Sequence, residues 1–198
     1  MESVKLQEPV VGPTYAESKA GVMNTRSGVK FNLVNPRAED VRIEDIASHL
    51  SKLCRFTGAT STFYSVAEHS VLVAFEIRQK HQHDRKLQLM GLLHDAAEAY
   101  CGDVSKPNKD AMRAVMREKF GTAVTPYDVI EGRVQSAVWE RFSLTDCAAP
   151  SATQIVKEAD NAVYCREAGL WMGRPGVPAL SPDTARELFL ATFEFLTK

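Results

Sequence analysis

Apolar residues recur with the spacing of an α-helix through most of the chain that follows Pro36. The stretch from Ile43 to Leu53 has apolar side chains at i, i+3, i+4 and i+7, the pattern of an amphipathic helix. Capping residues and apolar faces predict further helices over Ser65 to Ile77, Leu87 to Tyr100, from Ser105 and Pro107 onward, Pro126 to Phe142, Ser151 to Leu170, and from Ser181 toward the C-terminus. The sequence therefore predicts one all-α domain, a bundle of about six or seven helices.

The N-terminal region lacks this periodicity. Residues 1–25 contain several prolines and glycines and read as an irregular extension. The segment from Thr25 to Val34 is consistent with a small β-turn and a short strand, which Pro36 ends. We place the domain at residues 26–198, which is enough chain for one hydrophobic core.

The composition is that of an ordinary globular protein. The chain has 24 basic and 25 acidic residues, so it has no surplus of charge for coating nucleic acid. Its four cysteines are scattered, and the N-terminus lacks the apolar core of a signal peptide. The longest apolar run, Val71 to Phe75, is too short to span a bilayer. We expect a cytoplasmic protein with no nucleic-acid or membrane partner.

One predicted helix carries an unusual pair, His94 and Asp95, within the run Met90-Gly-Leu-Leu-His-Asp-Ala-Ala. Burying an imidazole beside a carboxylate is costly unless a partner compensates both, and a metal ion commonly does so. A second pair, His83 and Asp84, lies in a charged run without apolar neighbours and reads as a solvated connection. The dipeptide alone is therefore weak evidence, and its surroundings decide its meaning.

His69 and Asp160 are the best partners for this pair. His69 shares a helix face with Val66 and Val73, and Asp160 lies on another largely apolar helix. Taken singly, His69 could be a hydrogen-bonded core residue, and Asp160 could pair with Lys157 or Arg166. Their co-occurrence with His94 and Asp95 favours one site for a divalent transition metal such as Co, Mn, Zn, Ni or Fe.

Two further carboxylates follow the pair. Glu98 is four residues after His94, on the same predicted helix face, where it could orient or deprotonate a bound water. It could equally support a ligand imidazole. Asp103 follows Gly102, the predicted helix end. It could donate a proton to a leaving oxygen or form a hydrogen bond with a sugar hydroxyl, or it could be only a turn residue.

Four cations are candidates for binding phosphate: Arg55, Lys109, Lys157 and Lys106. Lys109 falls in the first turn of a predicted helix, where the helix dipole disfavours a cation, so a nearby anion would explain it. Arg55 lies between Cys54 and Phe56 at the end of an apolar helix and is the least surface-like of the set. For any single lysine, a solvated surface position is the ordinary alternative.

These motifs resemble the HD-domain metal-dependent phosphohydrolases. Cys-Arg55-Phe56, Tyr-Ser-Val-Ala-Glu-His69-Ser and Leu-Leu-His94-Asp95-Ala-Ala-Glu98-Ala-Tyr-Cys-Gly-Asp103 are similar to bacterial 5′-deoxynucleotidases, and still more to phage dATP triphosphohydrolases. The resemblance implies an HD-domain helical bundle, with His69, His94, Asp95 and Asp160 as metal ligands and Glu98 and Asp103 as catalytic groups. It implies phosphate contacts by Arg55, Lys109 and Lys157, and a nucleoside bordered by Phe56.

The expected activity is hydrolysis of a deoxynucleotide, dATP first, to deoxyadenosine and triphosphate, in the host cytoplasm if the chain is phage-encoded. The alternatives are a 5′-deoxynucleotidase that acts on monophosphates and a non-catalytic nucleotide-sensing module with a structural metal. The presence of Glu98 and Asp103 argues against the non-catalytic sensing module, because a structural metal site does not need them. The resemblance also implies a homo-oligomer, a dimer or a hexamer.

Overall fold

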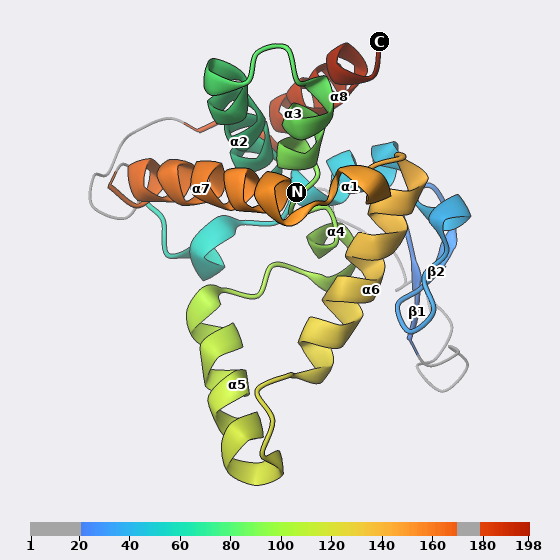
Figure 1. Ribbon diagram of the computed structural model, residues 1–198, viewed down its shortest axis with the longest axis vertical. Coiled ribbons are helices and arrows are strands. Elements are labelled where there is room, and N and C mark those ends of the chain that lie inside the picture. The colour runs from blue at the N-terminus through green and yellow to red at the C-terminus, as the bar shows by residue number, and fades with distance from the viewer. Residues whose placement is uncertain (1–20, 170–178) are drawn as a thin grey trace, which may run out of the picture.

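The computed structural model describes residues 21–169 and 179–198, and it confirms the all-α class. These residues contain eight α-helices (Figure 1): α1 Ile43–Leu50, α2 Val66–Lys80, α3 Arg85–Leu92, α4 Glu98–Cys101, α5 Lys106–Phe120, α6 Pro126–Arg141, α7 Pro150–Glu167 and α8 Pro182–Thr197. Within them, no helix has both the length and the apolar character needed to cross a bilayer.

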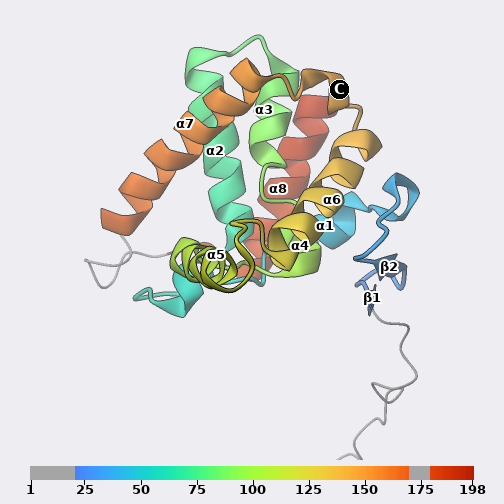
Figure 2. The ribbon, with the colours of Figure 1, turned by 60° about the horizontal axis from the view of Figure 1, so that its bottom comes forward.

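The helices form a packed body with a projecting arm. Helix α2 packs against α3, α7 and α8, and α8 also contacts α1 and α3. Figure 2 shows these helices together, while α5 and the start of α6 project away from them in Figure 1. Helix α5 accordingly has no buried residue. The core therefore centres on α2 and α3, the two helices that carry the histidines of interest.

The N-terminal prediction is partly wrong. Residues 1–20 of the predicted irregular extension lie outside the described residues, but Val22–Asn24 forms the strand β1. This strand pairs antiparallel with β2, Lys30–Asn32, so that Met23 is opposite Phe31. Phe31 is fully buried and stacks on the ring of Tyr100, which anchors the hairpin to the body. Leu170, the expected end of the helix that begins near Ser151, also lies outside the described residues.

The helix predicted over Leu87 to Tyr100 is divided in two, which explains the eighth helix. Helix α3 ends at Leu92, and the chain turns through residues 93–97 before α4 begins at Glu98. The turns are closed by bonds from the N–H of Ala96 to the carbonyl of Leu93 and from Glu98 to Asp95. His94 and Asp95 thus lie at a break between helices, and Glu98 does not share one continuous helix with them.

Helices α2 and α3 approach closely at Gly91. A Cβ atom added there would lie 2.5 Å from the Cδ1 atom of Ile77 and 3.4 Å from the Cα atom of Ala74. The missing side chain therefore allows α3 to lie close to α2 just before His94. The connection between the two helices includes His83 and Asp84, and Asp84 accepts a bond from the N–H of Leu87 as the N-cap of α3.

We predict that Gly91→Ala destabilises the protein, whereas Gly132→Ala does not. The new methyl group at residue 91 must displace the buried Ile77, and such overpacking costs about 1–3 kcal/mol, partly offset by the better helix propensity of alanine. Gly132 is exposed in α6 with no atom within 4 Å of an added Cβ, so there the propensity gain of up to about 1 kcal/mol remains. Urea unfolding of both variants tests this, and equal stabilities would contradict the close approach.

Candidate metal centre and its surroundings

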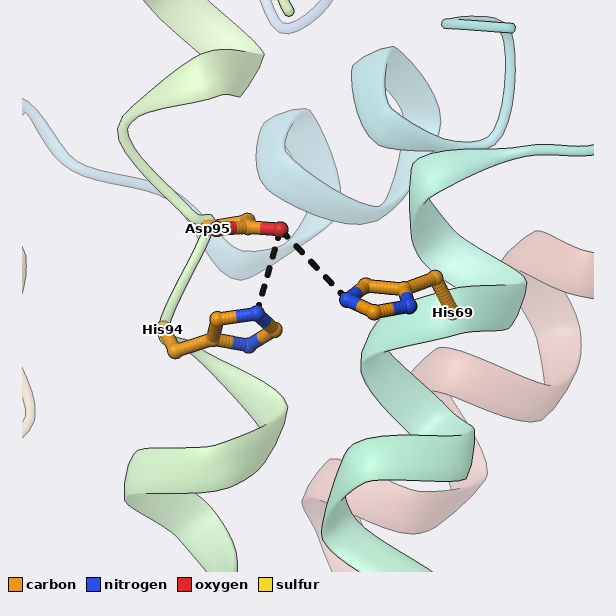
Figure 3. Close-up of side chains that lie close together, drawn as sticks. All are labelled: His69, His94 and Asp95. Carbon is orange, nitrogen blue, oxygen red and sulfur yellow. Dashed lines mark ion pairs between the residues drawn. The ribbon is translucent and has the colours of Figure 1, made fainter. Parts of the chain in front are cut away.

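His69, His94 and Asp95 form a group able to hold a metal ion. Each offers one ligand atom, and the three atoms lie within 4.8 Å of one another. Figure 3 shows the imidazole of His69 on α2 and that of His94 after α3 both directed toward the carboxylate of Asp95. The Oδ2 atom of Asp95 lies 3.1 Å from His94 Nε2 and 3.8 Å from His69 Nε2.

Asp160, on α7, joins the same cluster. Its Oδ1 atom lies 3.1 Å from His69 Nε2 and 3.8 Å from His94 Nε2. Arg166, one of its possible surface partners, pairs instead with Glu76 at 2.9 Å. All four predicted ligands therefore come together from α2, from the turn after the next helix, α3, and from α7, which is distant in the sequence.

Hydrogen bonds at the far side of each ring determine which nitrogen faces the cluster. The Nδ1 atom of His69 lies 2.8 Å from a carboxylate oxygen of Glu167, and that of His94 lies 2.8 Å from the carbonyl oxygen of Gly91. Both partners can only accept, since Glu167 is ionised, so each Nδ1 atom carries the hydrogen. In a neutral ring, each Nε2 atom then directs its lone pair toward the carboxylates.

This arrangement fits a cation. Both Nε2 atoms are buried and have no well-directed hydrogen bond among the described residues, although each has a carboxylate oxygen at 3.1 Å. A lone pair and a carboxylate oxygen that face each other in a buried site repel unless a positive charge lies between them. Two imidazole nitrogens and two carboxylates are a donor set suited to a divalent transition metal.

Without a metal ion, a proton supplies the missing charge. Burial opposes a charged imidazole, but Asp95 and Asp160 together raise the pKa of His94 well above its ordinary value. The carboxylates respond in the opposite sense. Burial opposes their ionisation, yet the two histidines hold the pKa values of Asp95 and Asp160 far below the usual range. The cluster therefore retains a cation in either state, and protons must compete with metal.

The negative charge of the two predicted catalytic carboxylates is balanced less well than that of Asp95 and Asp160. Burial, reinforced by Asp95 and Asp103, raises the pKa of Glu98 well above its ordinary value, and Lys109 and Arg55 only partly oppose this. The Oε2 atom of Glu98 is buried without a hydrogen-bond partner in the part of the chain that the structure describes. Burial likewise raises the pKa of Asp103. Both groups are therefore easier to protonate than a surface carboxyl.

The predicted phosphate-binding cations separate into two kinds. Arg55 is only 12% exposed, and its Nη1 atom lies 3.7 Å from Asp95. Lys109 is half-buried, with Nζ 2.7 Å from Glu131 and 3.9 Å from Glu98, so the nearby anion expected from its helix position is the protein's own. Lys106 is exposed and pairs with Asp110, and Lys157 is exposed on α7. The structure does not bring these last two into the buried cluster.

Phe56 lies beside Arg55 in a strained turn. The guanidinium carbon is 5.3 Å from the centroid of the Phe56 ring. Phe56 and Thr57 both have φ of +56°, a left-handed conformation that costs a residue with a side chain about 1 kcal/mol or more. The ring of Phe56 also contacts that of Tyr164, with centroids 5.8 Å apart. Tyr164 is 46% exposed and lies one turn after Asp160 on α7.

Glu167 and Tyr64 are the main residues near the centre that the sequence did not predict. Glu167 is buried at the end of α7, where it accepts hydrogen bonds from His69 Nδ1 and from the hydroxyl of Tyr64. A signal for Glu167 was present, because it continues the buried face of α7 formed by Val156, Ala159 and Val163. Tyr64 precedes the cap of α2, and nothing in its sequence neighbours indicates a partner 103 residues away.

Comparison with known proteins places the chain in a family. No family model matches it. YfdR of Escherichia coli, an uncharacterized protein, is 30% identical over 192 residues, which are 89% of this chain and 96% of YfdR. The chain belongs to the YfdR family. RCAP_rcc00048 of Rhodobacter capsulatus, also uncharacterized, is 34% identical over 137 residues, which are 68% of this chain and 64% of that protein.

For this member of the YfdR family, we predict that His94→Ala abolishes tight metal binding and His83→Ala does not. The first change removes a ligand nitrogen from the buried cluster, whereas His83 lies in the exposed connection between α2 and α3. Isothermal titration with Co²⁺ measures both affinities. If His94→Ala kept the wild-type affinity, the ligand assignment would be wrong.

We also predict that metal affinity increases with pH. His94 must lose its proton to bind the metal, and Asp95 and Asp160 hold that proton to a pH well above the ordinary value for histidine, despite burial. Below the raised pKa, displacement of one proton changes the apparent affinity by about tenfold per pH unit. Competition with a calibrated chelator between about pH 6 and pH 8 measures the slope. An affinity independent of pH would contradict proton competition at His94.

Proposed function

We propose that this protein is an HD-domain metal-dependent phosphohydrolase that acts on deoxynucleotides, with dATP as the first candidate substrate and deoxyadenosine and triphosphate as products. The observation that carries the proposal is the place of Arg55. Its guanidinium is largely buried and lies 3.7 Å from Asp95 within the candidate metal centre. A buried arginine next to metal ligands is suited to an anionic oxygen group such as a phosphate.

His69, His94, Asp95 and Asp160 would hold the metal, with Co, Mn, Zn, Ni and Fe as candidates. When bound, such an ion supplies Lewis acidity to a phosphoryl group and makes a water nucleophile available near neutral pH. Arg55 would orient the phosphate and stabilise the negative charge that develops on its oxygens. The protein's own contribution is therefore to position the phosphate and the proton-transfer groups around one phosphorus atom.

Glu98 and Asp103 would move the protons. The oxygen of a water forms a new bond to the α-phosphorus while the bond from phosphorus to the 5′-oxygen breaks. Glu98, with one buried oxygen lacking a partner, is suited to accept the proton of the water. Asp103, whose pKa burial raises, is suited to donate a proton to the departing 5′-oxygen. The products are the deoxynucleoside and the phosphate chain.

The aromatic pair of Phe56 and Tyr164 would face the nucleoside. The two rings contact each other beside Arg55, and Tyr164 is half-exposed. Exposed aromatic rings next to a phosphate site are suited to stack on a base. The base would then lie beside the turn of residues 55–58 and α7.

One observation favours a 5′-deoxynucleotidase as a second candidate. A triphosphate needs positive charge beyond the α-phosphate, and the predicted lysines supply little that is free. Lys109 pairs with Glu131 and Lys106 pairs with Asp110. Lys157, exposed on α7 near Asp160, is the one predicted lysine without an ion pair to a described residue. A monophosphate would need only the metal and Arg55.

Product analysis separates these functions. The protein is incubated with Co²⁺ or Mn²⁺ and each deoxynucleoside tri- or monophosphate in turn, and phosphorus-31 NMR identifies the released product. Triphosphate released from dATP supports the first candidate, and phosphate released only from monophosphates supports the second. Tight nucleotide binding without any turnover would overturn both and favour a sensing module.

We predict that Glu98→Gln lowers kcat by about 10²- to 10⁴-fold and leaves the metal content unchanged, because Glu98 moves a proton and is not a ligand. Glu118→Gln, at an exposed position on α5, is the matched control and should keep wild-type kcat. Steady-state kinetics with metal analysis of each variant measures both quantities. Full activity in Glu98→Gln would remove Glu98 from the mechanism.

A further inference from the structure

Glu167 is a buried carboxylate that is not one of the predicted ligands or catalytic groups. Its side chain is 2% exposed at the last turn of α7. The hydroxyl of Tyr64 and the Nδ1 atom of His69, the latter at 2.8 Å, both hydrogen-bond to its Oε1 atom. The Nε atom of Arg55 lies 3.3 Å from its Oε2 atom, as an ion pair without a well-directed hydrogen bond. Two hydrogen bonds and an ion pair inside a protein core restrict the position of this carboxylate.

These contacts close a ring of charged groups around the candidate metal centre. From Glu167 the ring passes through His69, whose Nε2 atom lies 3.8 Å from Asp95, and returns through Arg55, whose Nη1 atom lies 3.7 Å from the same Asp95 oxygen. Glu167 therefore contacts one metal ligand directly and is linked to a second through the arginine. The ring joins α2, α7, the turn after α3, and the turn of residues 55–58.

Two physical consequences follow for the site. A carboxylate on Nδ1 keeps the hydrogen on that atom, leaves Nε2 free to bind a metal, and increases the basicity of the ring. A second carboxylate beside Arg55 compensates a guanidinium that would otherwise face Asp95 alone in a buried place. Without Glu167, the ring of His69 and the fork of Arg55 would each lose their main fixed partner.

We propose that Glu167 is the positioning residue of the metal centre, which holds His69 in its ligand tautomer and keeps Arg55 directed at Asp95. The proposal rests on the metal-binding part of the proposed function and not on deoxynucleotide hydrolysis. Tyr64 has a supporting role, because its hydroxyl donates a hydrogen bond to the same carboxylate oxygen that His69 contacts. Glu167 acts through His69 and Arg55, without contact with substrate.

The first test is Glu167→Gln, which preserves the shape of the side chain and removes its charge. The expected result is a Co²⁺ affinity lowered by about 10- to 100-fold, with a changed visible absorption spectrum of the bound ion. Glu158→Gln, an exposed position on the same helix, is the matched control and should behave as wild type. Wild-type affinity and spectrum in Glu167→Gln would overturn the proposal.

A second measurement needs no variant and stands even if Glu167→Gln does not fold. Nitrogen-15 NMR of the Zn²⁺-loaded wild-type protein reports which nitrogen of His69 carries the hydrogen. Hydrogen on Nδ1 and zinc on Nε2 supports the proposal, and the reverse arrangement overturns it.

The outcomes also separate this proposal from the proposed function. A wild-type protein that binds no metal overturns both. Metal binding that depends on Glu167, in a protein that hydrolyses no deoxynucleotide, supports the positioning role and overturns only the hydrolase. Deoxynucleotide hydrolysis by a protein whose metal affinity does not depend on Glu167 supports the hydrolase and overturns the positioning role.

Discussion

The Nε2 atoms of His69 and His94 face the carboxylates of Asp95 and Asp160 inside the helical body, each within 3.1 Å of one carboxylate oxygen. The acceptors on the other side of each ring direct the lone pairs inward, so the centre requires a positive charge. A proton can supply it below the raised pKa of His94, and a metal ion can supply it when that proton leaves. The raised pKa of His94 and the lowered pKa values of Asp95 and Asp160 reflect this requirement.

The fold serves the centre by bringing three segments together. Gly91 lets α3 approach α2, the turn after α3 presents His94 and Asp95 at a helix break, and α7 contributes Asp160. Around these ligands, negative charge exceeds what the imidazoles can balance. Arg55 and Lys109 partly compensate it, and burial together with the remaining charge of Asp95 and Asp103 raises the pKa of Glu98. A phosphate that binds Arg55 would add further negative charge, so a cation would have to bind together with it.

The sequence predicts much of this arrangement, and its failures have physical reasons. Apolar spacing predicts the helices, and the four candidate ligands stand out because they lie in three apolar segments. The break at residues 93–97 was missed because no glycine or proline marks it, and tertiary packing decides it. The partner of Lys109 was missed because Glu131 is 22 residues away on another helix. Glu167 was missed although it continues an apolar face, because a glutamate near a helix end ordinarily reads as solvated.

Anomalous diffraction from a crystal of the protein grown with Co²⁺ would show whether the cluster holds a metal ion. We expect one strong anomalous peak per chain, between His69, His94, Asp95 and Asp160, at about 2.1 Å from each Nε2 atom. Either a peak held by other residues, or no peak with both Nε2 atoms engaged only in hydrogen bonds, would contradict it.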